Sequence, residues 1–124
     1  MRVARLIARI LLGLVFTVFG LNGFLHFLPM PPMSGPPADF FAAMFKTGYM
    51  LHLIFGAQVI GGVLVLAGVF VPLGLTILAP VIVNIFFFHL HLDPGGLPLA
   101  LIVVILEVFL AWCYRDKFAP LFSS

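Results

Sequence analysis

The sequence contains very few charged residues. Only 8% of its 124 residues are charged and 64% are hydrophobic, whereas an ordinary soluble domain has roughly 25% and 45–50%. A water-soluble protein of this size needs far more polar surface to cover its core, so the composition excludes a soluble globular protein. The formal net charge is only +2, and the basic residues lie near the two ends of the chain rather than along one stripe. This distribution excludes a nucleic-acid-binding protein.

Cysteine is also nearly absent. Cys113 is the single cysteine of the sequence, so the chain has no disulfide framework, no C-x-x-C redox pair and no thiolate metal cluster. Thiol exchange requires paired cysteines, and we exclude it as an activity of this chain alone.

Long apolar runs are what the sequence has in abundance. A helix that crosses a bilayer needs roughly 20 mainly apolar residues, and proline and glycine divide the chain into four such runs. We expect spans at about residues 6–28, 49–70, 73–92 and 97–114. The runs predict an all-α protein: a transmembrane four-helix bundle that forms a single integral-membrane domain over residues 1–124 and has the lipid bilayer as its first partner.

The basic residues indicate the orientation of the spans. Three arginines begin the chain, two basic residues follow the last span, and a single lysine lies between the first two spans. These residues are Arg2, Arg5, Arg9, Arg115, Lys117 and Lys46. Because cytoplasmic loops carry the excess of Lys and Arg, both termini are expected in the cytoplasm. The basic start imitates a secretory signal, but no small-residue cleavage site precedes the prolines, so we expect a retained first span.

The connection between the first two spans is predicted to contain a short helix. Phe40, Phe41, Met44 and Phe45 recur at helical spacing and form one apolar face. The run is too short to cross a bilayer, and we expect an interfacial helix that covers the outer mouth of the bundle.

One polar residue falls near the middle of each span. At about 1.5 Å of helical rise per residue, each lies about 12–20 Å from the cytoplasmic end of its helix. These residues are Asn22, Gln58, Asn84 and Glu107. A carboxylate at this depth costs roughly 2.5–3.5 kcal/mol unless it is neutral, paired or hydrated, so Glu107 should face inward. It is either a proton carrier or ligand-anchoring group, or a protonated side chain that hydrogen-bonds to Asn84 or Gln58 and holds the helices together.

The histidines form a second polar layer, nearer the outer side. Three spans contribute to this layer, with an aspartate just beyond the third span, and Asn84 shares a helix face with the last histidine. The members are His26, His52, His89, His91 and Asp93. They could bind a metal ion, or contact a quinone and move its protons, or bond to loop carbonyls and lipid headgroups. No H-x-x-x-H pair occurs on one helix, and His89 and His91 lie about 200° apart. The pattern therefore favours a structural role first, a quinone contact second and a metal site last, and it does not identify a cofactor.

Three stretches of the chain resemble the DoxX family of small four-helix membrane proteins. They are R-I-L-L-G-L-V-F-T-V-F-G-L-N-G-F, N-I-F-F-F-H-L-H-L-D-P-G-G-L-P-L-A and E-V-F-L-A-W-C-Y-R-D-K-F-A-P-L-F, which begin at Arg9, Asn84 and Glu107. The resemblance covers nearly the whole chain. The positions that look familiar are Asn84, His89, Asp93, Pro94, Glu107 and Arg115.

The resemblance implies a four-helix bundle in the bacterial inner membrane. Some relatives are membrane subunits of thiosulfate:quinone oxidoreductases or partners of soluble redox proteins. We therefore expect a membrane subunit, non-catalytic or only weakly catalytic by itself, that associates with a redox complex through quinone, through other protein subunits or through another copy of itself. The alternative is a structural or assembly protein with no redox ligand. A transporter is disfavoured, because the four spans show no inverted repeat.

Overall fold

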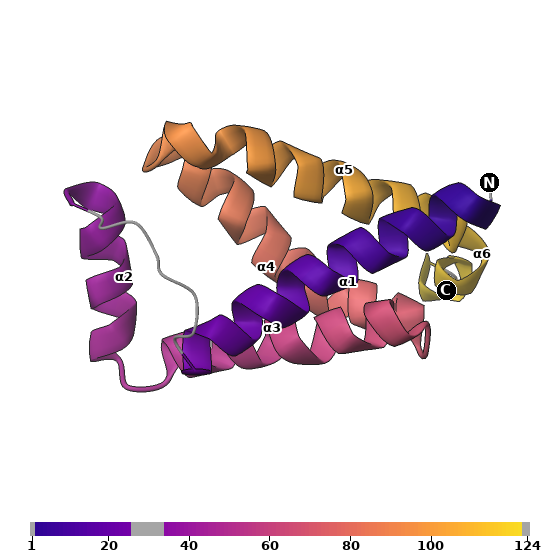
Figure 1. Ribbon diagram of the computed structural model, residues 1–124, viewed down its shortest axis with the longest axis horizontal. Coiled ribbons are helices and arrows are strands. Elements are labelled where there is room, and N and C mark those ends of the chain that lie inside the picture. The colour runs from indigo at the N-terminus through magenta and orange to yellow at the C-terminus, as the bar shows by residue number, and fades with distance from the viewer. Residues whose placement is uncertain (1, 26–33, 123–124) are drawn as a thin grey trace.

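The computed structural model describes residues 2–25 and 34–122 and is all-α in these parts (Figure 1). The long helices are α1 (Arg2–Leu25), α3 (Met50–Ala67), α4 (Val71–His91) and α5 (Leu97–Cys113). The shorter elements are α2 (Pro36–Lys46), the 3-10 turn η1 (Pro94–Gly96), α6 (Arg115–Phe118) and the 3-10 turn η2 (Ala119–Phe122). The expected fold class is confirmed, with the short helix α2 placed between the first two spans.

Proline and glycine set the helix ends. Gly68 ends α3 in the left-handed conformation, with φ of 77°, and its N–H donates to the carbonyl oxygen of Leu64 at 3.0 Å. Pro72 lies in the first turn of α4, where its missing N–H costs nothing. Pro94 begins the turn that reverses the chain between α4 and α5. The end of the first expected span, residues 26–28, lies outside the described residues.

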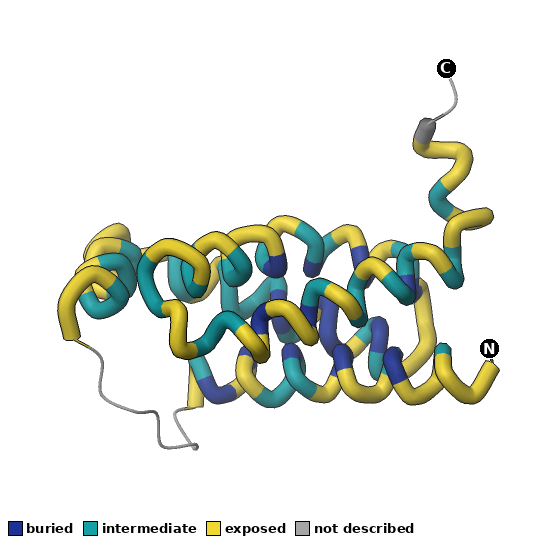
Figure 2. The backbone as a smooth tube through the Cα atoms, turned by 90° about the horizontal axis from the view of Figure 1, so that it is seen from above, coloured by how far each residue is buried: buried dark blue, intermediate teal, exposed yellow. Residues whose placement is uncertain are grey.

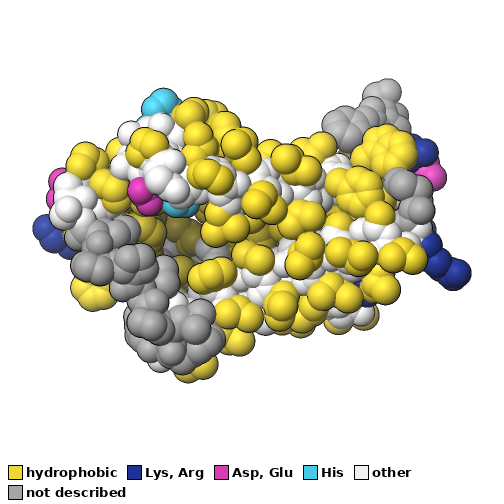
Figure 3. Space-filling view, turned by 45° about the horizontal axis from the view of Figure 1, so that its top comes forward, with side chains coloured by type: hydrophobic (Ala, Val, Ile, Leu, Met, Phe, Trp, Pro, Cys, Tyr) yellow, Lys and Arg dark blue, Asp and Glu magenta, His cyan; other side chains and the backbone are white. Residues whose placement is uncertain are grey.

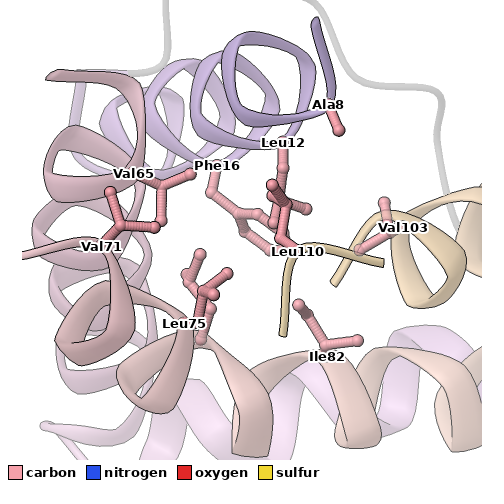
Figure 4. Packing of buried hydrophobic residues seen from close by; sticks show 10 residues of the cluster. Ala8, Leu12, Phe16, Val65, Val71, Leu75, Ile82, Val103 and Leu110 are labelled. Carbon is pink, nitrogen blue, oxygen red and sulfur yellow. The ribbon is translucent and has the colours of Figure 1, made fainter. Parts of the chain in front are cut away.

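The four long helices form a closed bundle in the order α1, α3, α4 and α5, and α5 returns to contact α1. The apolar core lies between the four long helices (Figure 4). Its residues in α1, α3 and α4 come mainly from the first half of α1, the end of α3 and the first half of α4, so the core is nearer the end where α1 begins. Its largest fully buried side chains are Leu12, Val65, Leu75, Leu78 and Leu110. In the other half of the bundle, toward α2, the buried side chains include the amides of Asn22 and Gln58. The two halves therefore differ in polarity.

Glycines allow the closest helix contacts. A Cβ added at Gly62 of α3 would lie 2.7 Å from the backbone nitrogen of Thr17, and one at Gly13 of α1 would lie 2.6 Å from that of Leu66. These distances are shorter than any ordinary carbon contact, so α1 and α3 pack through their backbones. Small residues at helix interfaces are typical of membrane proteins, where close van der Waals packing replaces the hydrophobic effect.

Hydrophobic side chains cover the outer surface of the bundle (Figure 3), and much of each long helix is exposed (Figure 2). In the four long helices, the last counted from Pro94, only 17–33% of the most apolar stretch is buried. Side chains such as Ile60, Ile105 and Val108 are 58–64% exposed. An exposed apolar surface of this extent requires lipid around it. The chain is a multi-pass integral membrane protein in contact with the bilayer.

The two ends of the bundle carry different elements. The first turn of α1 and the short helix α6 lie at one end, and α2 stands across the opposite end (Figure 1). The expectation of cytoplasmic termini and the assignment to the bacterial inner membrane stay predictions.

Candidate functional site

A cavity of about 290 Å³ lies at the α2 end of the bundle. Three helices and the segment after α4 enclose it: α2 contributes Phe40 and Phe41, α3 contributes Phe55 and Gln58, and α4 contributes a stripe of five residues. In Figure 3 the surface is hollowed near this end, with acidic and histidine side chains at the rim. The cavity lies in the half of the molecule that contains buried amides, and Val81 and Ile85 in its wall also pack against the apolar core.

Aromatic rings make most of the wall. The ring of Phe88 on α4 lies 5.4 Å, between centroids, from the rings of both Phe40 and Phe41 on α2. These are tilted and edge-on contacts, the arrangements that aromatic pairs prefer. They attach α2 to α4 across the end of the cavity. Phe45 does not share this face, since it is 73% exposed.

Helical spacing explains the α4 stripe. Val81, Asn84, Ile85, Phe88 and His89 recur every three or four residues and line the cavity together. The polar members Asn84 and His89 are five residues apart, about 140° around the helix, so they form the two edges of this stripe and Phe88 lies between them. Sequence reasoning had paired Asn84 with His91, which instead stacks on Phe87, 6.0 Å between ring centroids, outside the cavity.

His89 has the most closely defined position of the polar residues. Its Nδ1 lies 3.2 Å from the carbonyl oxygen of Asp93 and 3.6 Å from the carboxylate Oδ2 of the same residue. Gly96 packs against the imidazole edge, where an added Cβ would overlap Cε1 and Nδ1. A neutral His89 that donates its Nδ1–H to this carbonyl keeps Nε2 as a hydrogen-bond acceptor.

Gln58 and Asn84 complete the polar lining. Gln58 is only 7% exposed and enters from α3, and Asn84 enters from α4. Each amide offers two N–H donors and one oxygen acceptor. The cavity thus combines aromatic walls with amide donors, an imidazole and the carboxylate of Asp93.

The other two described histidines, His52 and His91, do not line this cavity. His52 lines a neighbouring cavity of about 390 Å³ with Tyr49 and Gly23, and its ring lies 5.7 Å from that of Phe24. The two cavities share Met44, Leu51 and Phe55 in their walls. The predicted site residue His26 lies outside the described residues.

No metal centre is assembled within residues 2–25 and 34–122, where no three side chains of His, Cys, Asp or Glu are grouped to hold an ion.

The predicted site residue Asn22 lies on α1, where its side chain is buried, with 5% of its surface exposed.

Glu107 lies in a different groove, between α4 and α5. Thr76, Ala79, Ala111 and Arg115 line this groove with it, and its volume is about 660 Å³. The Oε1 atom of Glu107 is buried and has no hydrogen-bond partner among the described residues. The interhelical bond from Glu107 to Asn84 or Gln58 is therefore not formed by this oxygen.

Comparisons with known proteins find no match: no family model, no curated protein and no solved structure matches the chain. The site must be interpreted from its own residues. Sequence reasoning placed Phe40 and Phe41 over the outer mouth of the bundle but missed their partner Phe88 and the role of Gly96. The i, i+4 spacing of Asn84 and Phe88 could have suggested that the two share a face of α4, but contact between α2 and α4 has no local signal.

Proposed function

We propose that the chain is a DoxX-like membrane protein that binds the ring of a quinone-class molecule in the cavity between α2, α3 and α4. In this role it serves as the membrane subunit of a redox complex of the bacterial inner membrane, together with other subunits or a second copy. The observation that carries the proposal is the combination, in one cavity, of Phe40, Phe41 and Phe88 with Gln58, Asn84 and His89.

The chemistry of the lining fits both forms of such a molecule. A quinone ring can stack on the phenyl rings, and its carbonyl oxygens accept hydrogen bonds from the amide N–H groups of Gln58 and Asn84. The hydroxyl of a quinol needs an acceptor, which the Nε2 of His89 supplies while Nδ1–H is held by Asp93. The same imidazole can take up the hydroxyl proton.

The volume of the cavity supports enclosure of the quinone ring without its tail. Ligand pockets span roughly 300–1,000 Å³, and about 290 Å³ is at the lower limit of this range. The ring fits inside, and an isoprenoid tail lies outside along the apolar surface, where the bilayer would hold it.

Two neighbouring glycines offer a matched test. Gly96→Ala places a methyl group on the His89 ring, whereas the nearest atom to a Cβ at Gly95 is a carboxylate oxygen of Asp93 at an ordinary 3.7 Å. We expect the purified chain to bind decylubiquinone saturably in calorimetric titration. Gly96→Ala should weaken binding about tenfold, because displacing the imidazole removes about one hydrogen bond to the ligand. Gly95→Ala should leave it unchanged.

Two outcomes would contradict the proposal. Absence of saturable binding by the unaltered chain would leave the structural or assembly role. Equal affinities of the Gly95→Ala and Gly96→Ala variants, both with unchanged melting temperature, would show that binding does not depend on His89.

A further inference from the structure

A second polar cavity, of about 390 Å³, lies at the opposite end of the bundle from α2. Arg2 and Arg5 reach it from α1, and Trp112, Cys113 and Arg115 reach it from the end of α5 and the start of α6. Basic side chains are visible at this end in Figure 3. Residues about 110 positions apart in the chain thus bring three guanidinium groups to one cavity.

Aromatic side chains hold two of these arginines. The Arg115 guanidinium carbon lies 4.4 Å from the centre of the Trp112 ring, and Nη1 donates to the Trp112 carbonyl oxygen at 3.0 Å. The Arg5 guanidinium lies 5.4 Å from the centre of the Tyr114 ring. Such cation–π contacts fix the planar groups in place before any ligand arrives, which reduces the entropy lost on binding.

The positive charge of this cavity is not neutralised within the described part of the chain. None of Arg2, Arg5 and Arg115 lies within ion-pair distance of a carboxylate of the described residues, and the contact between His89 and Asp93 is at the other end of the bundle. Asp116 and Lys117 follow directly on α6 and cancel each other. A net excess of three guanidinium charges therefore lines the cavity.

We propose that this cavity binds the phosphate of an anionic phospholipid. The fork of N–H donors on an arginine matches phosphate oxygens in a bidentate geometry. The cavity adjoins the apolar outside of α1 and α5, where Val3 is 67% and Val108 is 62% exposed. Acyl chains of a lipid bound at its headgroup would cover these side chains. The positive-inside bias explains why basic residues lie at this end but not why they converge around a cavity between two helices.

The test is lipid binding by the whole purified chain, counted by native mass spectrometry in detergent. Phosphatidylglycerol should bind at least about tenfold more tightly than phosphatidylcholine, because each charge-assisted bond contributes about that factor. Arg115→Gln should remove most of this preference. Arg115→Lys should restore part of it, since lysine keeps the charge without the fork. Lys117→Gln is the matched control: it removes one positive charge at the same end but not from the cavity, and should change the affinity less than about twofold.

Three results would overturn the proposal. An equal loss in Lys117→Gln and Arg115→Gln would indicate general attraction to a positive surface. Equal affinity for the two lipids would remove the charge dependence. Complete displacement of phosphatidylglycerol by millimolar inorganic phosphate would assign the cavity to a soluble anion. If Arg115→Gln does not fold, Arg5→Gln tests the same cavity from the other helix.

Discussion

Glu107 shows how a single polar residue can be placed at a cost to stability. Its Oε1 is buried beside Ala111 and Thr76 without a hydrogen bond from the described residues. Leaving a buried acceptor unsatisfied costs about 1–3 kcal/mol. Ionisable residues inside membrane spans are retained despite this cost where they bind a ligand, a proton or a partner helix. Glu107 is therefore a candidate for such a role.

Glu107→Leu should therefore increase the free energy of unfolding by about 1 kcal/mol or more, because leucine fills the groove and needs no hydrogen bond. Unfolding by SDS, followed by circular dichroism, measures the change. Val108→Leu is the control at a lipid-facing neighbour, 62% exposed, and should change little. A loss of stability in Glu107→Leu but not in Val108→Leu would mean that the carboxyl group already has a stabilising partner.

For single residues, the sequence predicts how far along its span a side chain lies better than it predicts the side of the helix to which that side chain points. The positions of Gln58, Asn84 and His89 along their spans follow from counting residues, and all three line one cavity. Counting residues does not show whether His89 or His91 lines the cavity, because the answer depends on where α4 ends. The carbonyl of Asp93, at the start of the η1 turn, fixes that end and captures the ring of His89.

Helices α1 and α3 depend on glycine for their contact. Gly62→Ala should lower the free energy of unfolding by about 1–3 kcal/mol, because a methyl group would enter the backbone of α1 and force the helices apart. Gly56→Ala, in the same helix, is the matched control, since a Cβ there meets nothing within 4 Å. It should be neutral or stabilising by up to about 1 kcal/mol through helix propensity. The same unfolding measurement applies, and equal effects of the two substitutions would contradict backbone-to-backbone packing.

Element boundaries and the position of α2 over the mouth of the bundle (Figure 1) were largely predictable, whereas the side chains that α2 contacts were not. The lengths of the apolar runs, together with Pro72 and Pro94, locate the long helices without any knowledge of tertiary contacts. The amphipathic spacing also indicates that α2 exists. Its position across the end of the bundle depends on the contacts of Phe40 and Phe41 with Phe88, nearly 50 residues away. Such nonlocal contacts leave no period in the sequence, so Phe88 could not be foreseen as the residue that α2 meets.

At the scale of the whole molecule, the arginine-lined cavity and the short helix α2 lie at opposite ends of the bundle. The arginine cavity and α6 occupy one end, and α2 occupies the other (Figure 1). The positive-inside bias then predicts that the α2 end faces away from the cytoplasm.

Cysteine labelling tests this orientation, because Cys113 is the single native cysteine and can be replaced by alanine. In that background, Ser34→Cys near the start of α2 should react with a membrane-impermeant maleimide in spheroplasts. Ala119→Cys, just after α6, should react only after the membrane is permeabilised. Both residues lie outside the long helices, and neither substitution changes a charge. The reverse pattern would invert the protein in the membrane.

The loose attachment of α2 has a kinetic consequence. None of its eleven residues is fully buried, and ring contacts with Phe88 are prominent among the few that hold it to the bundle. Local unfolding of such a segment costs only a small part of the global free energy, so its amide hydrogens should exchange long before those of α1 and α3. Transient undocking of this one short helix would widen the mouth of the cavity. A ring bound at the proposed site would then leave sooner, while the membrane spans stay packed.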